Sequence, residues 1–241
     1  MSKTDILGVK LDNVGRAQAL ERVLGFLGGE GYNAVFTPNP EMVMRARRDP
    51  SFRKVLNGGD LVVADGVGVV LASHLLGGGL AERVAGMDLV QDVLAHKKGL
   101  KVFLLGAKPG VAQAAAENLA LSYGVEVVGH RHGYFANDEE EDVAAQVRAA
   151  APDLLLVGLG SPRQEIFIDS HRLRLGARVA IGCGGSIDVF AGVARRAPLW
   201  AQKSGLEWAH RLATQPTRLP RMVSLPHFAL CVLADGIRVR K

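Results

Sequence analysis

Short apolar, β-branched runs alternate along most of the chain with longer stretches in which apolar residues recur every three to four positions. The short runs predict strands, and the nearly continuous apolar character of Val102–Leu105 and Leu154–Val157 is typical of strands that are buried on both faces. The predicted strands are Ile6–Val9, Ala34–Thr37, Leu61–Ala64, Val102–Leu105, Val125–Val128, Leu154–Val157 and Val179–Ile181.

The longer stretches predict amphipathic helices, with the clearest helical period between Ala112 and Ala120. Regular alternation of strands and helices predicts an α/β fold with a mainly parallel sheet and helices on both faces. The predicted helices are Val14–Leu27, Pro40–Leu56, Val67–Leu76, Leu89–His96, Val111–Tyr123, Glu139–Ala150 and Pro162–Leu175.

The pattern changes at about residue 191, where prolines divide the chain into short pieces. The prolines are Pro198, Pro216, Pro220 and Pro226. Between them, Leu199–Leu212 predicts one amphipathic helix that contains both tryptophans of the chain. We therefore expect an α/β core over residues 1–190 and a helical appendage over residues 191–241.

Composition agrees with a folded domain. The 241 residues are 48% hydrophobic and 22% charged, which excludes a disordered or a collagen-like chain. Two cysteines are too few for a disulfide scaffold and favour a reducing compartment. Residues 1–13 lack the apolar segment of a signal peptide, and the apolar run Phe228–Ala234 is too short to span a membrane. We expect a soluble or peripherally bound protein.

Charge is concentrated at the C-terminal end. Of the net charge of +5, residues 191–241 contribute +7, from nine Lys and Arg against two acids. The other 190 residues hold 20 basic and 22 acidic side chains. Such a segment attracts phosphates, anionic lipid or nucleic acid, and the alternative interpretation is a solvated helical face.

The loops that follow the predicted strands carry the candidate chemistry, because ligands of open α/β sheets bind at the carboxyl ends of strands. Glycine-rich turns follow three strands and contain Gly106, Gly160 and Gly184, whose backbone N–H groups are suited to an anion. The alternative is that these are ordinary turns and that residues such as Asn39 and Asp65 only cap helices.

Several enzyme classes lack their signatures here. The sequence has no G-x-x-x-x-G-K-[ST] loop, no G-x-G-x-x-G after the first strand and no G-x-S-x-G. It also has no Asp-x-Asp metal clamp, and His130 and His132 form a pair without an evident third ligand. We expect neither a metal nor a cofactor.

Several separate motifs resemble, in order, those of the WecG/TagA/CpsF glycosyltransferases, family 26. They are Thr37-Pro38-Asn39-Pro40-Glu41, Ala64-Asp65-Gly66, residues 82–89 (ERVAGMDL), residues 158–165 (GLGSPRQE), Arg196-Ala197-Pro198-Leu199-Trp200 and Gly205-Leu206-Glu207-Trp208. The resemblance extends from about Ile6 to Arg221.

The resemblance implies a Rossmann-like fold with a basic C-terminal helical appendage. It also implies inverting, metal-independent transfer of a sugar from a UDP-sugar to a polyprenyl-diphosphate-linked saccharide, in the synthesis of bacterial surface polysaccharides or wall polymers. Such an enzyme works at the inner face of the cell membrane, to which the appendage would bind, and has no nucleic-acid partner. A homo-oligomer is compatible with the sequence.

The same resemblance suggests roles for particular residues. Asp65 matches the proposed general base and Thr37 an essential threonine, and one carboxylate suffices to take the proton of an acceptor hydroxyl. Arginines and N–H groups would compensate the charge of the leaving diphosphate. The other matched positions are Asn39, Arg83 and Gln164 in the pocket, Tyr134 and Asp188 near the uridine, and Arg163, Arg218 and Arg221 near the phosphates.

Two other functions remain to be compared with this one. A Rossmann-type, nucleotide-dependent oxidoreductase fits the α/β pattern but lacks the dinucleotide fingerprint. A non-enzymatic, basic anion-binding module fits the charge of the appendage. Stabilisation by UDP but not by NAD would favour the transferase, whereas salt-sensitive binding of nucleic acid without turnover would favour the binding module.

Overall fold

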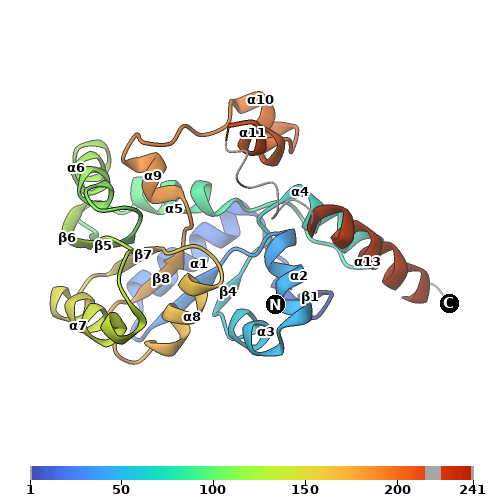
Figure 1. The fold of residues 1–241 in the computed structure, drawn as a ribbon, viewed down its shortest axis with the longest axis horizontal. Helices are drawn as coiled ribbons and strands as arrows, with labels where there is room; N and C mark the ends of the chain where they lie inside the picture. Colours follow the sequence, from blue (N-terminus) through green and yellow to red (C-terminus); the bar gives the residue numbers. More distant parts are fainter. Residues whose placement is uncertain (1, 215–223, 240–241) are drawn as a thin grey trace.

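The computed structural model describes residues 2–214 and 224–239 and contains a six-stranded parallel sheet flanked by helices (Figure 1). The strand order is β4-β3-β8-β7-β5-β6, with Val35 of β3 opposite Ile181 of β8, and the β5–β6 pair has a register shift between Val102 and Phe103. The strands are β3 (Asn33–Phe36), β4 (Leu61–Val62), β5 (Lys101–Gly106), β6 (Glu126–Arg131), β7 (Leu154–Gly158) and β8 (Val179–Gly182). The predicted parallel α/β sheet is confirmed.

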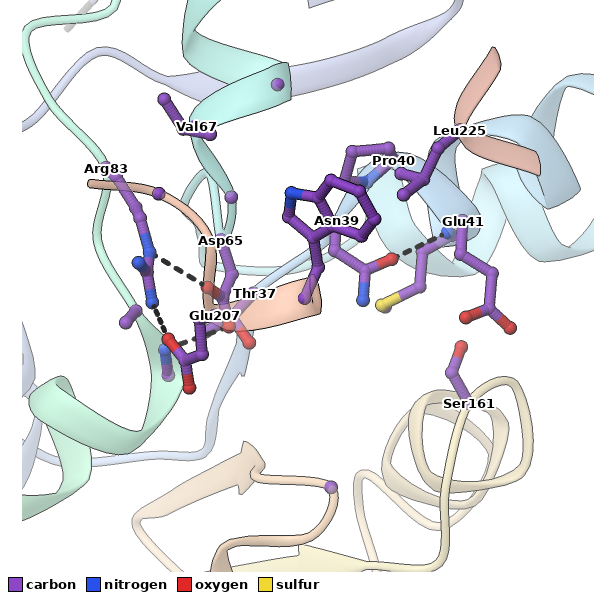
Figure 2. A pocket seen from close by; sticks show the side chains of 18 of the residues that line it. Thr37, Asn39, Pro40, Glu41, Asp65, Val67, Arg83, Ser161, Glu207 and Leu225 are labelled. Carbon is purple, nitrogen blue, oxygen red and sulfur yellow. Dashed lines mark hydrogen bonds and ion pairs between the residues drawn. The ribbon is translucent and has the colours of Figure 1, made fainter. Parts of the chain in front are cut away.

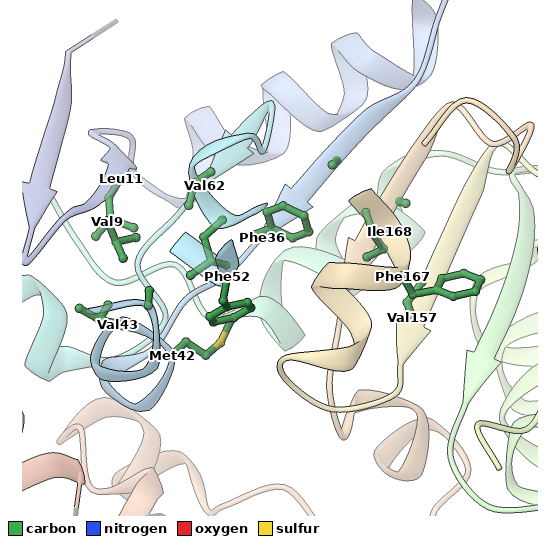
Figure 3. Packing of buried hydrophobic residues seen from close by; sticks show 14 of the residues in the cluster. Val9, Leu11, Phe36, Met42, Val43, Phe52, Val62, Val157, Phe167 and Ile168 are labelled. Carbon is green, nitrogen blue, oxygen red and sulfur yellow. The ribbon is translucent and has the colours of Figure 1, made fainter. Parts of the chain in front are cut away.

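Helices cover both faces of this sheet, as predicted, because successive strand residues point to opposite sides. Leu154 and Leu156 of β7 pack in one buried cluster, whereas Leu155 and Val157 pack in the other. The first cluster includes residues from α1 (Arg16–Gly28), α5 (Gly86–His96), α6 (Val111–Tyr123) and α9 (Ser186–Phe190). The second includes residues from α2 (Pro40–Arg48), α3 (Pro50–Asn57), α4 (Val67–Leu75), α7 (Glu140–Ala150, preceded by the 3₁₀ turn Asn137–Glu139), α8 (Arg163–Ser170) and α13 (Ser224–Val239). Figure 3 shows part of this second cluster around Phe36, Phe52 and Phe167.

The N-terminal prediction was wrong in detail. Residues Ile6–Val9 do not form one strand but span the turn of an antiparallel hairpin, β1 (Lys3–Ile6) and β2 (Val9–Asp12), which is separate from the main sheet. Leu7 and Gly8 occupy the turn with positive φ, and the carboxylate of Asp5 accepts a hydrogen bond from the Gly8 N–H at 2.7 Å. Two buried strand ends next to a tight turn therefore resemble a single apolar run in the sequence.

Two predicted helices are each divided in two. The predicted helix Pro40–Leu56 is interrupted at Asp49. Pro50 has no N–H with which to continue the hydrogen bonding of α2, and the carboxylate of Asp49 caps α3. Leu199–Leu212 consists of α10 (Leu199–Lys203) and α11 (Glu207–Thr214), separated at Gly205, whose φ is +74°.

The appendage ends in a longer helix than the prolines indicated. Helix α13 has 16 residues, and Pro226 lies in its first turn, where the missing N–H costs no helical hydrogen bond. Phe228 and Val232 are buried and attach α13 to α2 and α4 (Figure 1). Within the described residues, none of the helices has both the length and the apolar character to cross a membrane. The division of the chain at residue 190 stays a prediction.

Candidate active site

A pocket of about 660 Å³ opens at the carboxyl ends of β3, β4, β7 and β8. Strands β3 and β8 are neighbours, yet the helices that follow them, α2 and α9, pack on opposite faces of the sheet. The two connections therefore diverge and leave a crevice between them, which is where open α/β sheets bind ligands. Residues that are far apart in the sequence meet in this crevice (Figure 2).

Asp65 and Thr37 both line the pocket, one after β4 and the other after β3. The backbone N–H of Asp65 donates to the carbonyl of Pro38 at 3.0 Å, which fixes the two loops to each other. One carboxylate oxygen of Asp65 accepts from the N–H of Gly86 at 3.2 Å, at the first residue of α5. The carboxylate of Asp65 therefore faces the positive end of that helix.

Arg83 lies between two carboxylates. Its Nε is 3.5 Å from Asp65 Oδ1, and its Nη2 donates to Glu207 Oε2 at 2.6 Å (Figure 2). Burial disfavours the charged guanidinium, but Asp65 and Glu207 outweigh this effect, so the pKa of Arg83 is raised. Because Glu207 belongs to α11, this chain of charges connects the appendage to the predicted base.

Asn39 caps helix α2, since its side-chain oxygen accepts from the N–H of Met42 at 3.0 Å. The amide nitrogen of the same side chain lies on the pocket side in Figure 2. The capping and the ligand-binding interpretations of Asn39 are therefore compatible, because they use different atoms.

Gln164 is buried, lines the pocket and connects helix α8 to the loop after β8. Its side-chain oxygen accepts from the N–H of Gly184 at 3.1 Å, and its nitrogen donates to Glu165 at 2.6 Å. Burial raises the pKa of Glu165, although its hydrogen bonds act in the opposite direction. Gly160 and Gly184 also line the pocket, with φ of +77° and +52°.

Three predicted ligand residues, Gly106, Tyr134 and Asp188, are absent from the described lining of the pocket. Gly106 approaches β7 closely, because a Cβ added to it would lie 2.4 Å from the carbonyl oxygen of Gly158. This glycine therefore has a packing role. Tyr134 is 64% exposed, and Asp188 lies in the short helix α9, where its carbonyl accepts from two N–H groups of the following turn. Their roles in binding stay predictions.

Arg163 also lies away from the described lining. Its guanidinium donates to the carbonyls of Gly133 and Phe135 at 3.1 and 2.9 Å, stacks on the Phe135 ring and faces Glu140 at 3.4 Å. In this structure Arg163 thus organises the loop before α7. The two remaining predicted residues, Arg218 and Arg221, lie outside the described residues.

Four further polar or aromatic residues line the pocket although the sequence did not single them out as ligands: Glu41, Ser161, Glu207 and Trp208. The sequence did contain evidence that pointed to Glu207. It is one of two acids in a strongly basic segment, and it belongs to the motif Gly205-Leu206-Glu207-Trp208, which resembles that of the glycosyltransferase family. Over residues 2–214 and 224–239, no three His, Cys, Asp or Glu side chains gather as a metal site would require.

The chain is similar to known glycosyltransferases. The family model described as "Glycosyl transferase WecG/TagA/CpsF family" matches residues 4–241. Relatives from Staphylococcus aureus strains MRSA252 and NCTC 8325 / PS 47 are each 37% identical over 244 residues, which cover 100% of this chain and 96% of the relative. Both are described as N-acetylglucosaminyldiphosphoundecaprenol N-acetyl-beta-D-mannosaminyltransferase.

Proposed function

Because the chain belongs to the WecG/TagA/CpsF glycosyltransferase family, we propose that it transfers N-acetylmannosamine from a UDP-sugar to N-acetylglucosamine linked through diphosphate to undecaprenol. Family membership confirms the resemblance of the motifs and makes the protein a glycosyltransferase, in preference to the oxidoreductase and the binding module. The sugars and the lipid are carried over from the description of the relatives.

In the proposed reaction, the acceptor hydroxyl attacks the anomeric carbon of the donor and passes its proton to the carboxylate of Asp65. A bond forms between the acceptor oxygen and the anomeric carbon, while the bond from that carbon to the diphosphate breaks. The electron pair of the broken bond remains on UDP. A β-linked product from an α-linked donor requires inversion, which a single displacement with one base provides.

The leaving diphosphate carries negative charge that the pocket has to compensate. Within the described pocket, we propose Arg83, which is also paired with Asp65 and Glu207, and the glycine turn at Gly160 for this purpose. The N–H of Gly184 already donates to the side chain of Gln164. Arg163, Arg218 and Arg221 are further proposed phosphate contacts, and Tyr134 and Asp188 are proposed for the uridine. Thr37, Asn39 and Gln164 are proposed to orient the two sugars.

The observation that carries this proposal is the meeting of Thr37, Asp65 and Arg83 in one pocket, from three separate motifs. The test is a transfer assay with a panel of UDP-sugars and a short-chain diphosphate-linked N-acetylglucosamine acceptor. We expect the highest rate with UDP-N-acetylmannosamine. Preference for another UDP-sugar would refute the choice of donor, and transfer from none would refute the proposed reaction.

We also propose that the basic appendage holds the enzyme at the inner surface of the cell membrane. Leu199 and Trp200 support this, because they are 71% and 63% exposed in a segment rich in Lys and Arg. The test is sedimentation with vesicles containing phosphatidylglycerol, against vesicles of phosphatidylcholine alone. Equal binding to both, or to neither, would contradict the proposal.

A further inference from the structure

One wall of the active-site pocket is apolar and exposed. Val67, Leu71 and Leu75 follow one another at intervals of four along α4, so they form one stripe on that helix. They are 39%, 57% and 43% exposed, and all three line the pocket. Large apolar side chains are usually covered when they form a continuous surface, so this stripe requires an explanation.

Helix α13 packs directly on α4 and supplies an adjoining apolar wall. Phe228 and Val232 line the pocket while being buried against the core, which holds the helix in place. Leu233, on the same helix, also lines the pocket and is 52% exposed. Figure 1 shows α13 beside α4. Side chains of both helices line the same pocket, and we call this apolar part of it the groove.

This groove is continuous with the polar part of the site, because one pocket is lined both by Asp65 and Arg83 and by Leu71, Leu75 and Leu233. Helix α4 begins at Val67, two residues after Asp65, and continues through Leu71 to Leu75. Of the described residues of α4 and α13 that line it, none is charged. The pocket is therefore suited to an amphipathic ligand, with a polar group at the sheet edge and a hydrocarbon chain between the two helices.

We infer that the groove between α4 and α13 binds the first isoprene units of the acceptor's lipid chain. This inference rests on the proposed function, which supplies an acceptor with a polar sugar diphosphate and an isoprenoid tail on one molecule. The groove binds the tail as a specific part of the substrate. This binding does not require the enzyme to contact the bilayer. Burial of hydrocarbon against leucine side chains provides the driving force.

The test compares two acceptors, N-acetylglucosaminyl diphosphate esters that carry either a methyl or a farnesyl group. Both are used without vesicles and below the concentration at which the farnesyl ester forms micelles. We expect kcat/KM of the wild type to be at least about tenfold higher for the farnesyl ester. In Leu75→Gln and Leu233→Gln this ratio should fall towards one.

Leu121→Gln is the matched control, because Leu121 is 85% exposed on α6 and outside the described lining of the pocket. It should keep the wild-type ratio. Leu71→Gln provides a third groove variant if one of the other two fails to fold, as judged by circular dichroism and melting temperature. An unchanged ratio in the folded groove variants would overturn the inference, as would a tail preference that the wild type shows only when vesicles are added.

Binding provides a readout that does not depend on turnover. Trp208 lines the pocket, and its fluorescence in a Trp200→Phe background should change on addition of the farnesyl ester. If the wild type binds the farnesyl ester more tightly than the methyl ester but transfers to neither, the groove is supported and the proposed reaction fails. If it transfers to both with the same kcat/KM, the proposed function stands and the groove is refuted.

Discussion

Replacing Glu207 by Gln should release the appendage from the active site. The change keeps the shape of the side chain and removes the charge that faces Arg83 at 2.6 Å. These two side chains are 11% and 21% exposed, so little water is available to replace the lost contact. Arg83 keeps its second carboxylate, Asp65, at 3.5 Å.

The expected magnitude lies between two limits. Removing one partner of a fully buried ion pair costs about 3–5 kcal/mol, whereas an exposed pair contributes about 0–1 kcal/mol. For a pair at the wall of a pocket whose arginine retains another carboxylate, we expect about 2 kcal/mol, in the range of a hydrogen bond to a charged group. That would shift the equilibrium between the docked and the released appendage by roughly 30-fold.

Fluorescence can measure this shift, because both tryptophans of the chain lie within the appendage. In Glu207→Gln we expect greater quenching by acrylamide and faster proteolysis between residues 191 and 214. Glu140→Gln is the matched control. It removes the carboxylate that lies 3.4 Å from Arg163, and neither residue belongs to the described lining of the pocket. It should leave both signals unchanged.

A double-mutant cycle with Arg83→Gln tests whether Glu207 acts through Arg83. If it does, Glu207→Gln should lower kcat/KM in the wild type and have little further effect in the Arg83→Gln background. Additive losses in the cycle, or wild-type quenching and proteolysis in Glu207→Gln, would refute the reasoning.

Four further predictions concern the site itself. Asp65→Asn should lower kcat by roughly 10²–10⁴-fold while binding of UDP, measured by calorimetry, stays near that of the wild type; near-normal turnover would leave Asp65 as a structural residue. Gly86→Ala should lower activity and melting temperature, because a Cβ there would lie 2.8 Å from the Thr37 hydroxyl oxygen, and an active, stable variant would contradict this packing. Burial raises the pKa of the Cys183 thiol to about 12, so at pH 8 about one thiol in 10⁴ is ionised; iodoacetamide should therefore modify Cys231 first, and equal rates would refute the burial of Cys183. Transfer should continue in excess EDTA, and a loss of activity that Mg²⁺ or Mn²⁺ restores would reveal a metal requirement.

Local sequence features determined most of the α/β core. The apolar runs of β5 and β7 predict buried strands because both faces of those strands are covered, and the helical period of α6 reports which of its faces is buried. Asn39 followed by Pro40 marks the start of α2, because a cap and a first-turn proline act within a few residues. The motifs at Thr37 and Asp65 also predicted where the pocket lies, since both follow strands of a parallel sheet.

The tertiary structure decided the contacts between distant parts of the chain. Arg83 and Glu207 are 124 positions apart, and no period or spacing pairs them. The same holds for Leu75 and Leu233, which face one groove only because Phe228 and Val232 attach α13 to the core. Periodicity and capping arise from interactions within a few residues and can be recognised in a sequence. The partners of a side chain across the molecule depend on how whole elements pack, and this depends on shape and burial summed over many residues at once.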